Sequence, residues 1–331
     1  MNDVLFIRLR LLGDIIFTIP ALQLFKNRYP KTRIHYLVEQ RFRELAELIP
    51  LIDRVITVPE KLGLTELHRF RRQVRSQKIR TVVDFHSGPT SALLTLTSGA
   101  EMRIGYRTPN RNWAYNHLVP RKVEGSLTHS VVNQARLLEI LGIDANDPPA
   151  YPLIPVSTSG ISPDVAQLVD GPPFVILHVG AGNRFRYWGV NHFAQLGRRL
   201  IDQRLRLVLV GNTEEERRKG GELTKRLPCV NLTGRLSLRE MHFIISRALV
   251  FVGADSGPLH LASLTATPLV ALYGPNLPQI SGPWRRENVQ IIQRELSCRP
   301  CSQRRCIYDT IRCMKEISVD KVHEAVARQI R

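Results

Sequence analysis

The sequence has no apolar run long enough to span a lipid bilayer. It also shows no secretory signal, because the apolar stretch within residues 1–10 is too short for the hydrophobic region of a signal peptide and is interrupted by Arg8 and Arg10. These absences argue against an integral membrane protein and against secretion. We expect a cytoplasmic protein that associates peripherally with the inner face of the cytoplasmic membrane.

Two common nucleotide-binding fingerprints are also missing. The segment 180–188 begins with Gly180-Ala181-Gly182 but has no third glycine, so it is not the GxGxxG loop of dinucleotide-binding proteins. No Gly-Lys-Ser/Thr follows it, which excludes a Walker A loop. The sequence therefore argues against a nucleotide-dependent dehydrogenase.

Cysteine is scarce, with five residues, of which four lie within residues 298–313. Cys298, Cys301, Cys306 and Cys313 form the pattern C-x₂-C-x₄-C-x₆-C, which is neither a secreted disulfide framework nor the paired C-x₂-C spacing of zinc ribbons. A zinc site, two disulfides and four free thiols all remain open. We expect a structural rather than a catalytic role, and no catalytic metal ion.

Acidic residues are few compared with basic ones. Asp and Glu total 29 against 47 Lys and Arg, which gives a formal net charge of +18. A charge this large predicts a polyanionic partner such as nucleic acid, an anionic membrane face or a phosphorylated substrate. A basic surface that serves only solubility is the alternative, but the clustering of basic residues at 69–80, 103–111 and 198–206 favours a partner.

The first half of the chain alternates short apolar segments with helical patterns. We expect strands at 4–7, 33–38, 54–58 and 81–85, and helices at 15–29, 60–77 and 130–141. Strands that alternate with helices predict parallel βαβ units with helices on both faces of the sheet.

A stretch rich in proline, serine and glycine, residues 147–173, is the best linker candidate. The pattern then restarts, with strands expected at 174–179, 205–210, 249–252 and 269–273 and helices at 190–203, 214–226 and 258–264. The sequence thus predicts an α/β protein of two Rossmann-like, doubly wound domains, residues 1–155 and 156–331, that face a central cleft.

The most informative segment joins a strand to a helix at residues 251–262. Ser256 and Gly257 would offer backbone N–H groups at the helix start, which suits a diphosphate. An ordinary turn capped by Asp255 or Ser256 is the alternative. Small-residue loops also end the strands before Gly180 and Gly274, and three such loops on one sheet edge favour a binding site.

Two charged residues follow neighbouring strands. Arg186 comes after the glycine turn and could neutralise a leaving phosphate, or could simply be exposed. Glu214 could accept both hydroxyls of a ribose, although acidic residues in a first helical turn also favour the helix dipole. Trp188 is expected to be a packing residue.

Asp14 is the candidate general base of the N-terminal half. It follows the first strand and could take a proton from an acceptor hydroxyl, although it could also be only a helix cap. Arg8 and Arg10 fall on the same face of an extended segment and could hold an acceptor phosphate.

These segments together carry a family resemblance. They are Arg8-Leu9-Arg10-x-x-Gly13-Asp14 with Thr18-x-Pro20-Ala21-Leu22, His178-x-Gly180-Ala181, Arg186-x-Trp188, Gly211-x-x-Glu214-Glu215-Glu216-Arg217, Gly253-x-Asp255-Ser256-Gly257-Pro258-x-His260-Leu261-Ala262 and Tyr273-Gly274-Pro275. In them the chain resembles glycosyltransferase family 9, the ADP-heptose:lipopolysaccharide heptosyltransferases. The cysteine cluster is similar to the C-terminal segment of the second heptosyltransferase type.

The resemblance implies a GT-B fold, with acceptor bound by the N-terminal domain and an ADP-sugar by the C-terminal domain. It implies inverting, metal-independent transfer of a heptose to the inner core of lipopolysaccharide on lipid A, without a cofactor. Asp14 would be the general base and Arg186, a lysine in some members, would help the leaving diphosphate. The implied donor-binding residues are Gly180, Ala181, Glu214, Asp255, Ser256, Gly257 and His260, and the implied acceptor-binding residues are Arg8, Arg10 and Gly13.

The acidic, lipid-linked acceptor that the resemblance implies agrees with the net charge, as does contact with an anionic membrane surface. Two alternatives stay open: a transferase of the same fold that uses another nucleotide-sugar, and a non-catalytic polyanion-binding or nucleic-acid-binding protein. Only the charge favours the latter, because the sequence has no recognition-helix motif and no aromatic-rich RNA-binding signature. We therefore expect no nucleic-acid partner.

Overall fold

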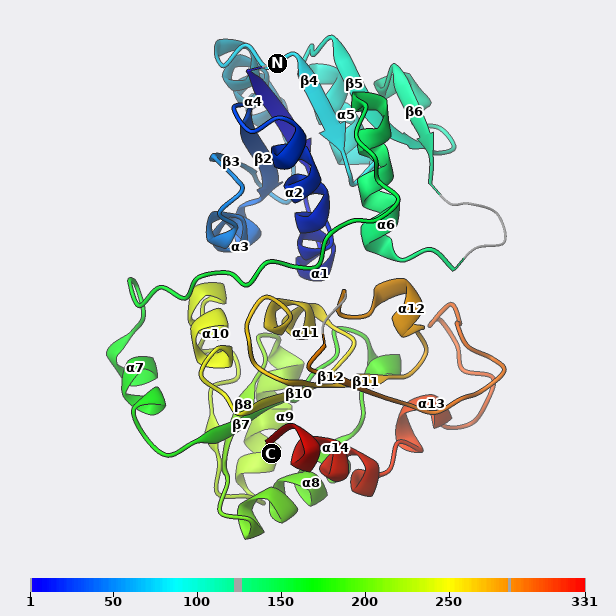
Figure 1. Cartoon of the computed structure of the whole chain (residues 1–331). Coiled ribbons are helices and arrows are strands. Elements are labelled where there is room, and N and C mark those ends of the chain that lie inside the picture. The colour runs from blue at the N-terminus through cyan, green and yellow to red at the C-terminus, as the bar shows by residue number, and fades with distance from the viewer. Residues whose placement is uncertain (1, 122–126, 285–286, 331) are drawn as a thin grey trace. The chain divides into compact units, whose positions relative to one another are not determined.

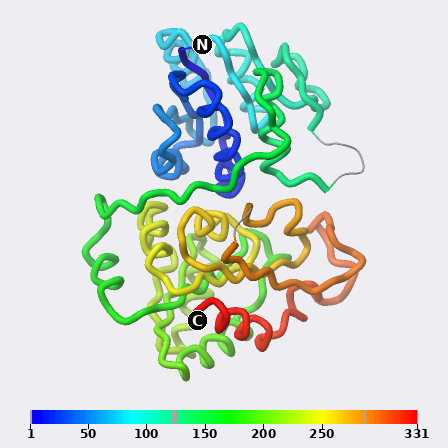
Figure 2. Tube along the Cα trace, in the orientation of Figure 1, coloured from blue at the N-terminus to red at the C-terminus, as the bar shows by residue number. Residues whose placement is uncertain are grey.

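The chain folds into two compact units, Met1–Ala150 and Tyr151–Arg331, in a computed structural model that describes residues 2–121, 127–284 and 287–330. The first unit runs from blue to green in Figure 1 and the second from green to red, and Figure 2 traces the same path as a tube. No helix in these described ranges combines the length and the apolar character that crossing a membrane requires.

The first unit contains a six-stranded parallel sheet with the order β3-β2-β1-β4-β5-β6. The strands are β1 Asp3–Ile7, β2 Arg33–Glu39, β3 Arg54–Val58, β4 Thr81–Asp84, β5 Met102–Arg107 and β6 His117–Pro120. The order reverses between β1 and β4, the switch point beside which doubly wound sheets bind their ligands at the carboxyl ends of the strands.

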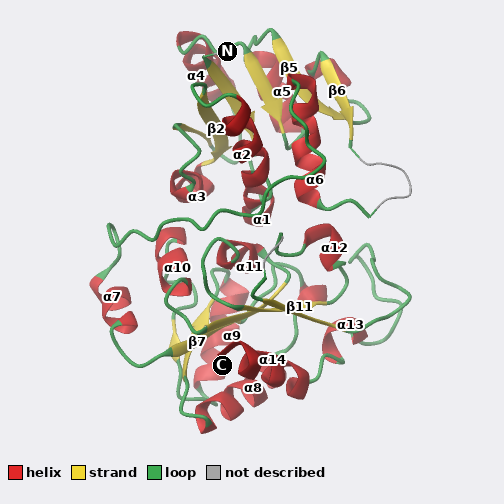
Figure 3. Cartoon of the chain, viewed as in Figure 1, coloured by secondary structure: helices red, strands yellow, loops and turns green. Residues whose placement is uncertain are grey.

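Helices cover both faces of this sheet (Figure 3). They are α1 Leu12–Ile16, α2 Ile19–Arg28, α3 Arg43–Leu48, α4 Leu64–Ser76, α5 Pro89–Thr97 and α6 Ser130–Ala135, with 3₁₀ turns η1 Gln40–Phe42, η2 Asn112–Ala114 and η3 Arg136–Leu141. Side chains alternate along β1, so Leu5 packs in one core cluster with Phe70 of α4, while Phe6 contacts Phe25 of α2 with ring centroids 5.1 Å apart.

The second unit repeats the plan with the sheet order β12-β11-β10-β7-β8-β9, again parallel. Its strands are β7 Phe174–His178, β8 Arg206–Val210, β9 Val230–Asn231, β10 Val250–Ala254, β11 Leu269–Tyr273 and β12 Val289–Gln293. Its helices are α7 Pro163–Val169, α8 Val190–Asp202, α9 Glu214–Thr224, α10 Leu238–Ile245, α11 Gly257–Ala262, α12 Pro278–Ser281, α13 Arg312–Lys315 and α14 Val319–Ile330, with the 3₁₀ turn η4 Arg184–Arg186.

Every strand expected from the sequence is present, whereas two expected helices and the expected linker need correction. The single helix expected over 15–29 is two helices, because Pro20 lacks a backbone N–H and is accommodated only in a first turn, that of α2. The pattern at 130–141 is an α-helix followed by a 3₁₀ turn. Part of the expected linker is ordered, since Pro163 begins α7.

Trp188 anchors the core of the second unit. Its side chain is fully buried, and its Nε1 donates a hydrogen bond to the carbonyl oxygen of Ile317 at 2.9 Å. Its ring meets Phe193 edge-on, with centroids 5.1 Å apart and an interplanar angle of 86°. The expectation that Trp188 is a packing residue is confirmed, and it joins the loop after β7 to the chain segment before α14.

We predict that Trp188→Ala lowers the free energy of unfolding by about 3–5 kcal/mol, because it leaves a large cavity and removes a partner from a buried carbonyl. Chemical denaturation followed by circular dichroism measures the change. Trp113, whose side chain is 55% exposed, offers the matched control. Trp113→Ala should change stability by less than about 1 kcal/mol, and equal losses in the two variants would contradict the assignment.

Candidate functional site

Four loops of the second unit meet at one edge of its sheet. The strands β11, β10, β7 and β8 are consecutive neighbours and all parallel, so the residues that follow Tyr273, Ala254, His178 and Val210 emerge on the same side. The expectation that three small-residue loops share one sheet edge is confirmed. This edge therefore gathers most of the residues that the sequence analysis singled out in the second half of the chain.

Asp255 lies at the centre of these loops and is only 3% exposed. Its carboxylate lies 3.4 Å from Nη1 of Arg186 and 3.5 Å from Nε2 of His260, and it accepts a hydrogen bond from Nδ2 of Asn276 at 2.5 Å. Burial alone would raise the pKa of Asp255, but the hydrogen bond and charge of His260, the charge of Arg186 and the bond from Asn276 outweigh it and lower the pKa. Asp255 therefore stays ionised.

Arg186 is held on two sides. Its Nε donates to Oε1 of Gln303 at 2.7 Å, its Nη1 donates to the carbonyl oxygen of Asp255 at 3.3 Å, and Nε2 of Gln303 donates to Oδ1 of Asn276 at 2.6 Å. These four residues form a closed polar ring. The second terminal nitrogen of Arg186 makes no hydrogen bond or ion pair within the described ranges, and 26% of the side chain is exposed. The ring thus fixes a guanidinium whose free edge can bind an anion.

A second buried polar chain connects three of the loops. Oγ of Ser256 lies 3.3 Å from Nδ1 of His178, and Nε2 of His178 lies 3.3 Å from Oε1 of Glu216. Glu216 also accepts hydrogen bonds from the backbone N–H groups of Asn212 and Thr213, at 2.6 and 2.8 Å. Burial would raise the pKa of Glu216, but these bonds and the charge of His178 hold it at about 2.

The position of Glu216 explains the glycine at 180. A Cβ atom on Gly180 would overlap the carboxylate of Glu216, so any side chain larger than hydrogen would displace it. Ala181 is buried beside it and lines a cavity of about 110 Å³ together with Gly182, Asn183, Arg184, Tyr187, Thr213, Glu215, Glu216 and Lys219. The glycine-containing loop is therefore shaped by the first turn of α9.

Glu214 lies elsewhere on α9. Its side chain is 87% exposed and 3.5 Å from Nε of Arg217, and it does not line the cavity that Glu215 and Glu216 line. Glu216 was missed by the sequence analysis, although the spacing Thr213-x-x-Glu216 is that of a capping box, which the structure contains. The capping pattern could have identified this residue as the inward-facing carboxylate.

The helix that follows Ser256 is short. Gly257–Ala262 gives α11 six residues, with Ser256 at its N-cap and Pro258 in its first turn. Its first N–H groups have no intrahelical partners and can bind an anion, but so short a helix contributes only a small dipole. Arg186 therefore adds a full positive charge beside this short helix.

Asp14 lies in the first turn of α1, at the carboxyl edge of the sheet of the first unit. Its Oδ2 is 2.5 Å from Nη2 of Arg8 and accepts a hydrogen bond from the backbone N–H of Leu11 at 3.4 Å. Arg8 is buried and also donates from Nη1 to the carbonyl oxygen of Phe85 at 2.7 Å. Because 36% of the Asp14 side chain is exposed, the carboxylate is oriented from within and open to solvent.

The other residues expected at this edge have different surroundings. Arg10 is exposed, with its Nε 3.7 Å from Oε1 of Glu39, and Gly13 is buried within α1. His86, which sequence reasoning missed, follows β4 beside them. Its burial, and then the charges of Arg8 and Arg10, lower its pKa to about 4, so it is neutral at pH 7.

The four clustered cysteines line one small cavity of about 70 Å³ in the second unit. All are free thiols, and burial, followed by the proximity of Cys301, raises the pKa of Cys313 to about 11. Within the described ranges, no group of three or more His, Cys, Asp or Glu side chains is placed to hold a metal ion.

Known proteins resemble this chain in sequence and in fold. Lipopolysaccharide heptosyltransferase 1 of Pseudomonas aeruginosa is 27% identical over 318 residues, which cover 92% of this chain and 87% of the relative. The structure of ADP-heptose LPS heptosyltransferase II of E. coli superposes with a TM-score of 0.80 at 21% identity, covering 100% and 98% of the two chains. An E. coli heptosyltransferase solved with ADP-2-deoxy-2-fluoro heptose gives a TM-score of 0.70 at 18% identity, covering 98% and 99%.

The two structural matches confirm the expected GT-B fold of two Rossmann-like sheets. The model of the family described as "Glycosyltransferase family 9 (heptosyltransferase)" matches residues 67–312, which include the loops after β7, β8, β10 and β11. The chain therefore belongs to glycosyltransferase family 9 and is a glycosyltransferase.

Proposed function

We propose that this glycosyltransferase moves a heptose from ADP-heptose to the inner core of lipopolysaccharide on lipid A. Family membership supports the reaction class, and the Pseudomonas aeruginosa and E. coli proteins named above support the sugar and the acceptor. The observation that carries the proposal is the polar ring around Arg186, which presents a fixed guanidinium edge beside the loops of the second unit.

The donor would bind to the second unit, residues 156–331 in the sequence-based division. The free edge of Arg186 and the N–H groups of Ser256 and Gly257 would contact the diphosphate, where they stabilise the charge that develops on the leaving group. His260 and Asp255 are buried and would act by holding Arg186 in position.

The nucleoside would lie against the loops after β7 and β8. Gly180 and Ala181 border the cavity beside α9, and the acidic first turn of that helix would accept the ribose hydroxyls. The sequence analysis gave this role to Glu214. We assign this role to Glu215 instead, because Glu215 lines the cavity, and Glu216 would fix the loop.

The acceptor would bind to the first unit, residues 1–155. Asp14 would remove the proton of the attacking hydroxyl while the bond between the anomeric carbon and the diphosphate breaks, and this single displacement inverts the anomeric configuration. Arg8 would position Asp14, while the exposed Arg10, beside Gly13, would meet an acceptor phosphate. Because Arg186 supplies the positive charge, the proposed step needs no metal ion.

The acceptor is anchored in a membrane, so the proposed reaction takes place at an anionic surface. The net charge of +18 supports peripheral association there, on the cytoplasmic side. The proposal involves no nucleic acid and no cofactor.

We predict that ADP raises the melting temperature of the protein more than UDP or GDP does at equal concentration. The nucleotide that binds the folded protein most tightly stabilises it most. A thermal-shift series over nucleotide concentration measures this. Arg186→Gln is the informative control, since it removes the guanidinium that is proposed to contact the diphosphate and should reduce the shift caused by ADP. Equal shifts for all three diphosphates would contradict an adenine-specific donor and favour another nucleotide-sugar.

We predict that Asp14→Asn lowers turnover by about 10²–10⁴-fold while donor affinity stays within about threefold of wild type. Asn keeps the size of the side chain and its capping ability but cannot take the proton. The measurement is turnover with ADP-heptose and lipid A core acceptor in the presence of EDTA, together with donor titration.

The chain contains a matched control for the capping role of Asp14. Glu66 also occupies the third position of a helix, α4, and accepts a hydrogen bond from the backbone N–H of Gly63 at 3.1 Å. Glu66→Gln should leave turnover unchanged. If Asp14→Asn turned over like Glu66→Gln, Asp14 would be a cap and not the base.

We predict that Glu216→Gln destabilises the protein by about 1–3 kcal/mol at pH 7. The folded-state pKa of about 2 lies below the ordinary value of 4.5, so the contribution of the carboxylate is complete above pH 4.5 and is lost as the pH falls through 2. The stability difference between wild type and variant should therefore shrink from pH 5 to pH 2. Denaturant titrations across this range test it, and Glu214→Gln, on the same turn but exposed, is the control and should change stability little at pH 7.

A further inference from the structure

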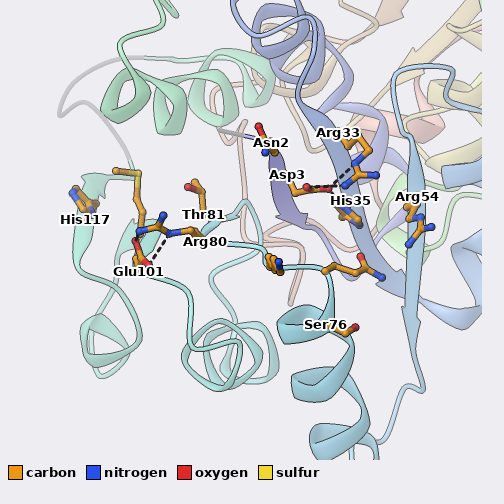
Figure 4. A pocket seen from close by; sticks show the side chains of 13 residues that line it. Asn2, Asp3, Arg33, His35, Arg54, Ser76, Arg80, Thr81, Glu101 and His117 are labelled. Atoms are coloured by element: carbon orange, nitrogen blue, oxygen red, sulfur yellow. Dashed lines mark hydrogen bonds and ion pairs between the residues drawn. The ribbon is translucent and has the colours of Figure 1, made fainter.

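A large cavity lies at the amino-terminal edge of the sheet in the first unit, the edge opposite to Asp14. Its volume is about 880 Å³, and each of the six strands contributes to its lining (Figure 4). The charged residues that line it are Asp3, Arg33, Arg54, Lys78, Arg80 and Glu101. None of them has a role in the proposed glycosyl transfer.

The two acidic residues of this cavity are already neutralised. Asp3 accepts hydrogen bonds from Nε and Nη2 of Arg33 at 2.9 and 3.0 Å and lies 2.7 Å from Nε2 of the buried His35. Glu101 accepts two bonds from Arg80, at 2.7 and 2.5 Å. Figure 4 shows Asp3 with its partners on one side of the cavity and Glu101 with Arg80 on the other, and dashed lines mark the contacts within each group.

Two lining cations remain without a partner. Arg54 and Lys78 are exposed, and their side chains make no hydrogen bond or ion pair with any residue in the described ranges. Figure 4 shows Arg54 beyond His35, with no dashed line to it. Gln77 and Asn2 line the same space and add neutral hydrogen-bond donors. The cavity therefore has an excess of two positive charges, which suits a dianion.

A second hollow continues this surface along α4. Its volume is about 580 Å³, and it is lined by His68, Arg71, Arg72, Arg75 and Ser76, of which Ser76 also lines the first cavity. Residues 68–80 contain no aspartate or glutamate. The opposite face of α4 packs into the core through Phe70 and Val74.

This row of arginines does not stabilise the helix by itself. Arg71 and Arg75 are four residues apart and Arg72 and Arg75 three apart, spacings at which like charges repel by some tenths of a kcal/mol per pair. None of the three has an ion-pair partner among the described residues. An anionic ligand would relieve the repulsion, and guanidinium groups bind phosphate in a planar, two-bonded geometry.

We propose that the amino-edge cavity and the α4 hollow form one binding site for a ligand that carries phosphate groups, separate from the nucleotide site of the second unit. Arg54 and Lys78 bind phosphate groups at the amino edge, and Arg71, Arg72 and Arg75 bind phosphate groups along α4. The ligand is either a free phosphorylated molecule or the phosphate headgroups of a lipid surface, since both present the same chemistry. The site does not depend on the proposed transfer reaction.

The first test is calorimetric titration of the whole protein with pyrophosphate at low ionic strength. Arg54→Gln/Lys78→Gln should weaken the amino-edge binding by about tenfold or more, because each lost cation removes a charge-assisted hydrogen bond. The control Lys225→Gln/Arg235→Gln makes the same charge change at exposed positions of the second unit and should bind as wild type does. Arg186→Gln should remove only the pyrophosphate that binds at the nucleotide site, so this variant distinguishes binding at the two sites. A melting temperature equal to that of wild type in each variant shows that the fold is kept.

The second test distinguishes a free ligand from a lipid surface. Vesicles that contain phosphatidylglycerol, compared with phosphatidylcholine vesicles, are sedimented with each variant. Loss of pyrophosphate binding in Arg54→Gln/Lys78→Gln supports a free phosphorylated ligand, and loss of sedimentation with phosphatidylglycerol alone supports a lipid headgroup. The proposal is wrong if Arg54→Gln/Lys78→Gln behaves like Lys225→Gln/Arg235→Gln in both assays. It is also wrong if Arg186→Gln alone abolishes all pyrophosphate binding while Arg54→Gln/Lys78→Gln binds vesicles as wild type does.

Discussion

A charged group that is removed from water must receive compensation from the protein, and both candidate sites of this chain are organised by that requirement. Asp255, nearly completely buried at the sheet edge of the second unit, needs the cation of Arg186, the imidazole of His260 and the amide of Asn276 to remain ionised. Meeting that need also fixes Arg186, since Gln303 completes the ring around it. The residue proposed to meet the diphosphate is thus held in place before any ligand arrives.

In the first unit the buried charge that needs compensation is positive rather than negative. There the buried charge is the guanidinium of Arg8, and its compensation comes from the carboxylate of Asp14 and the carbonyl oxygen of Phe85. The arrangement leaves one side of Asp14 open to solvent and removes its rotational freedom. In its proposed role as the base, Asp14 would lose little entropy when an acceptor hydroxyl approaches, which is the advantage of a preorganised group.

The large positive charge is distributed unevenly between these functions. Arg71, Arg72 and Arg75 on α4, together with Arg54 and Lys78 at the amino edge of the first sheet, have no ion-pair partner among the described residues. Repulsion between these like charges destabilises the helix, and packing of the core does not require charges at these exposed positions. The surface is therefore better explained by an anionic ligand than by solubility alone.

Local sequence determined much of this protein. Apolar strands such as Phe174–His178 alternate with amphipathic helices, which made the fold class predictable. Parallel strands necessarily bring the loops after Tyr273, Ala254 and His178 to one edge of the second sheet, so the meeting of the loops that carry Arg186 and Asp255 could also be predicted. Periodicity was weaker for the strands β5, β6, β9 and β12, whose residues are less buried or less uniformly apolar, and these strands were not predicted.

Tertiary structure alone decided which of these residues act together. Glu214 and Glu216 are two positions apart on one helix, and because successive residues turn by about 100° around its axis, one faces solvent and the other lies under Gly180. The contact of Arg186 with Gln303 joins positions 117 residues apart. A local pattern can specify a turn or a cap, but it carries no information about the partner that a side chain meets when distant segments pack. That packing determined that Glu216 is the buried carboxylate and that the guanidinium of Arg186 has an edge free to bind an anion.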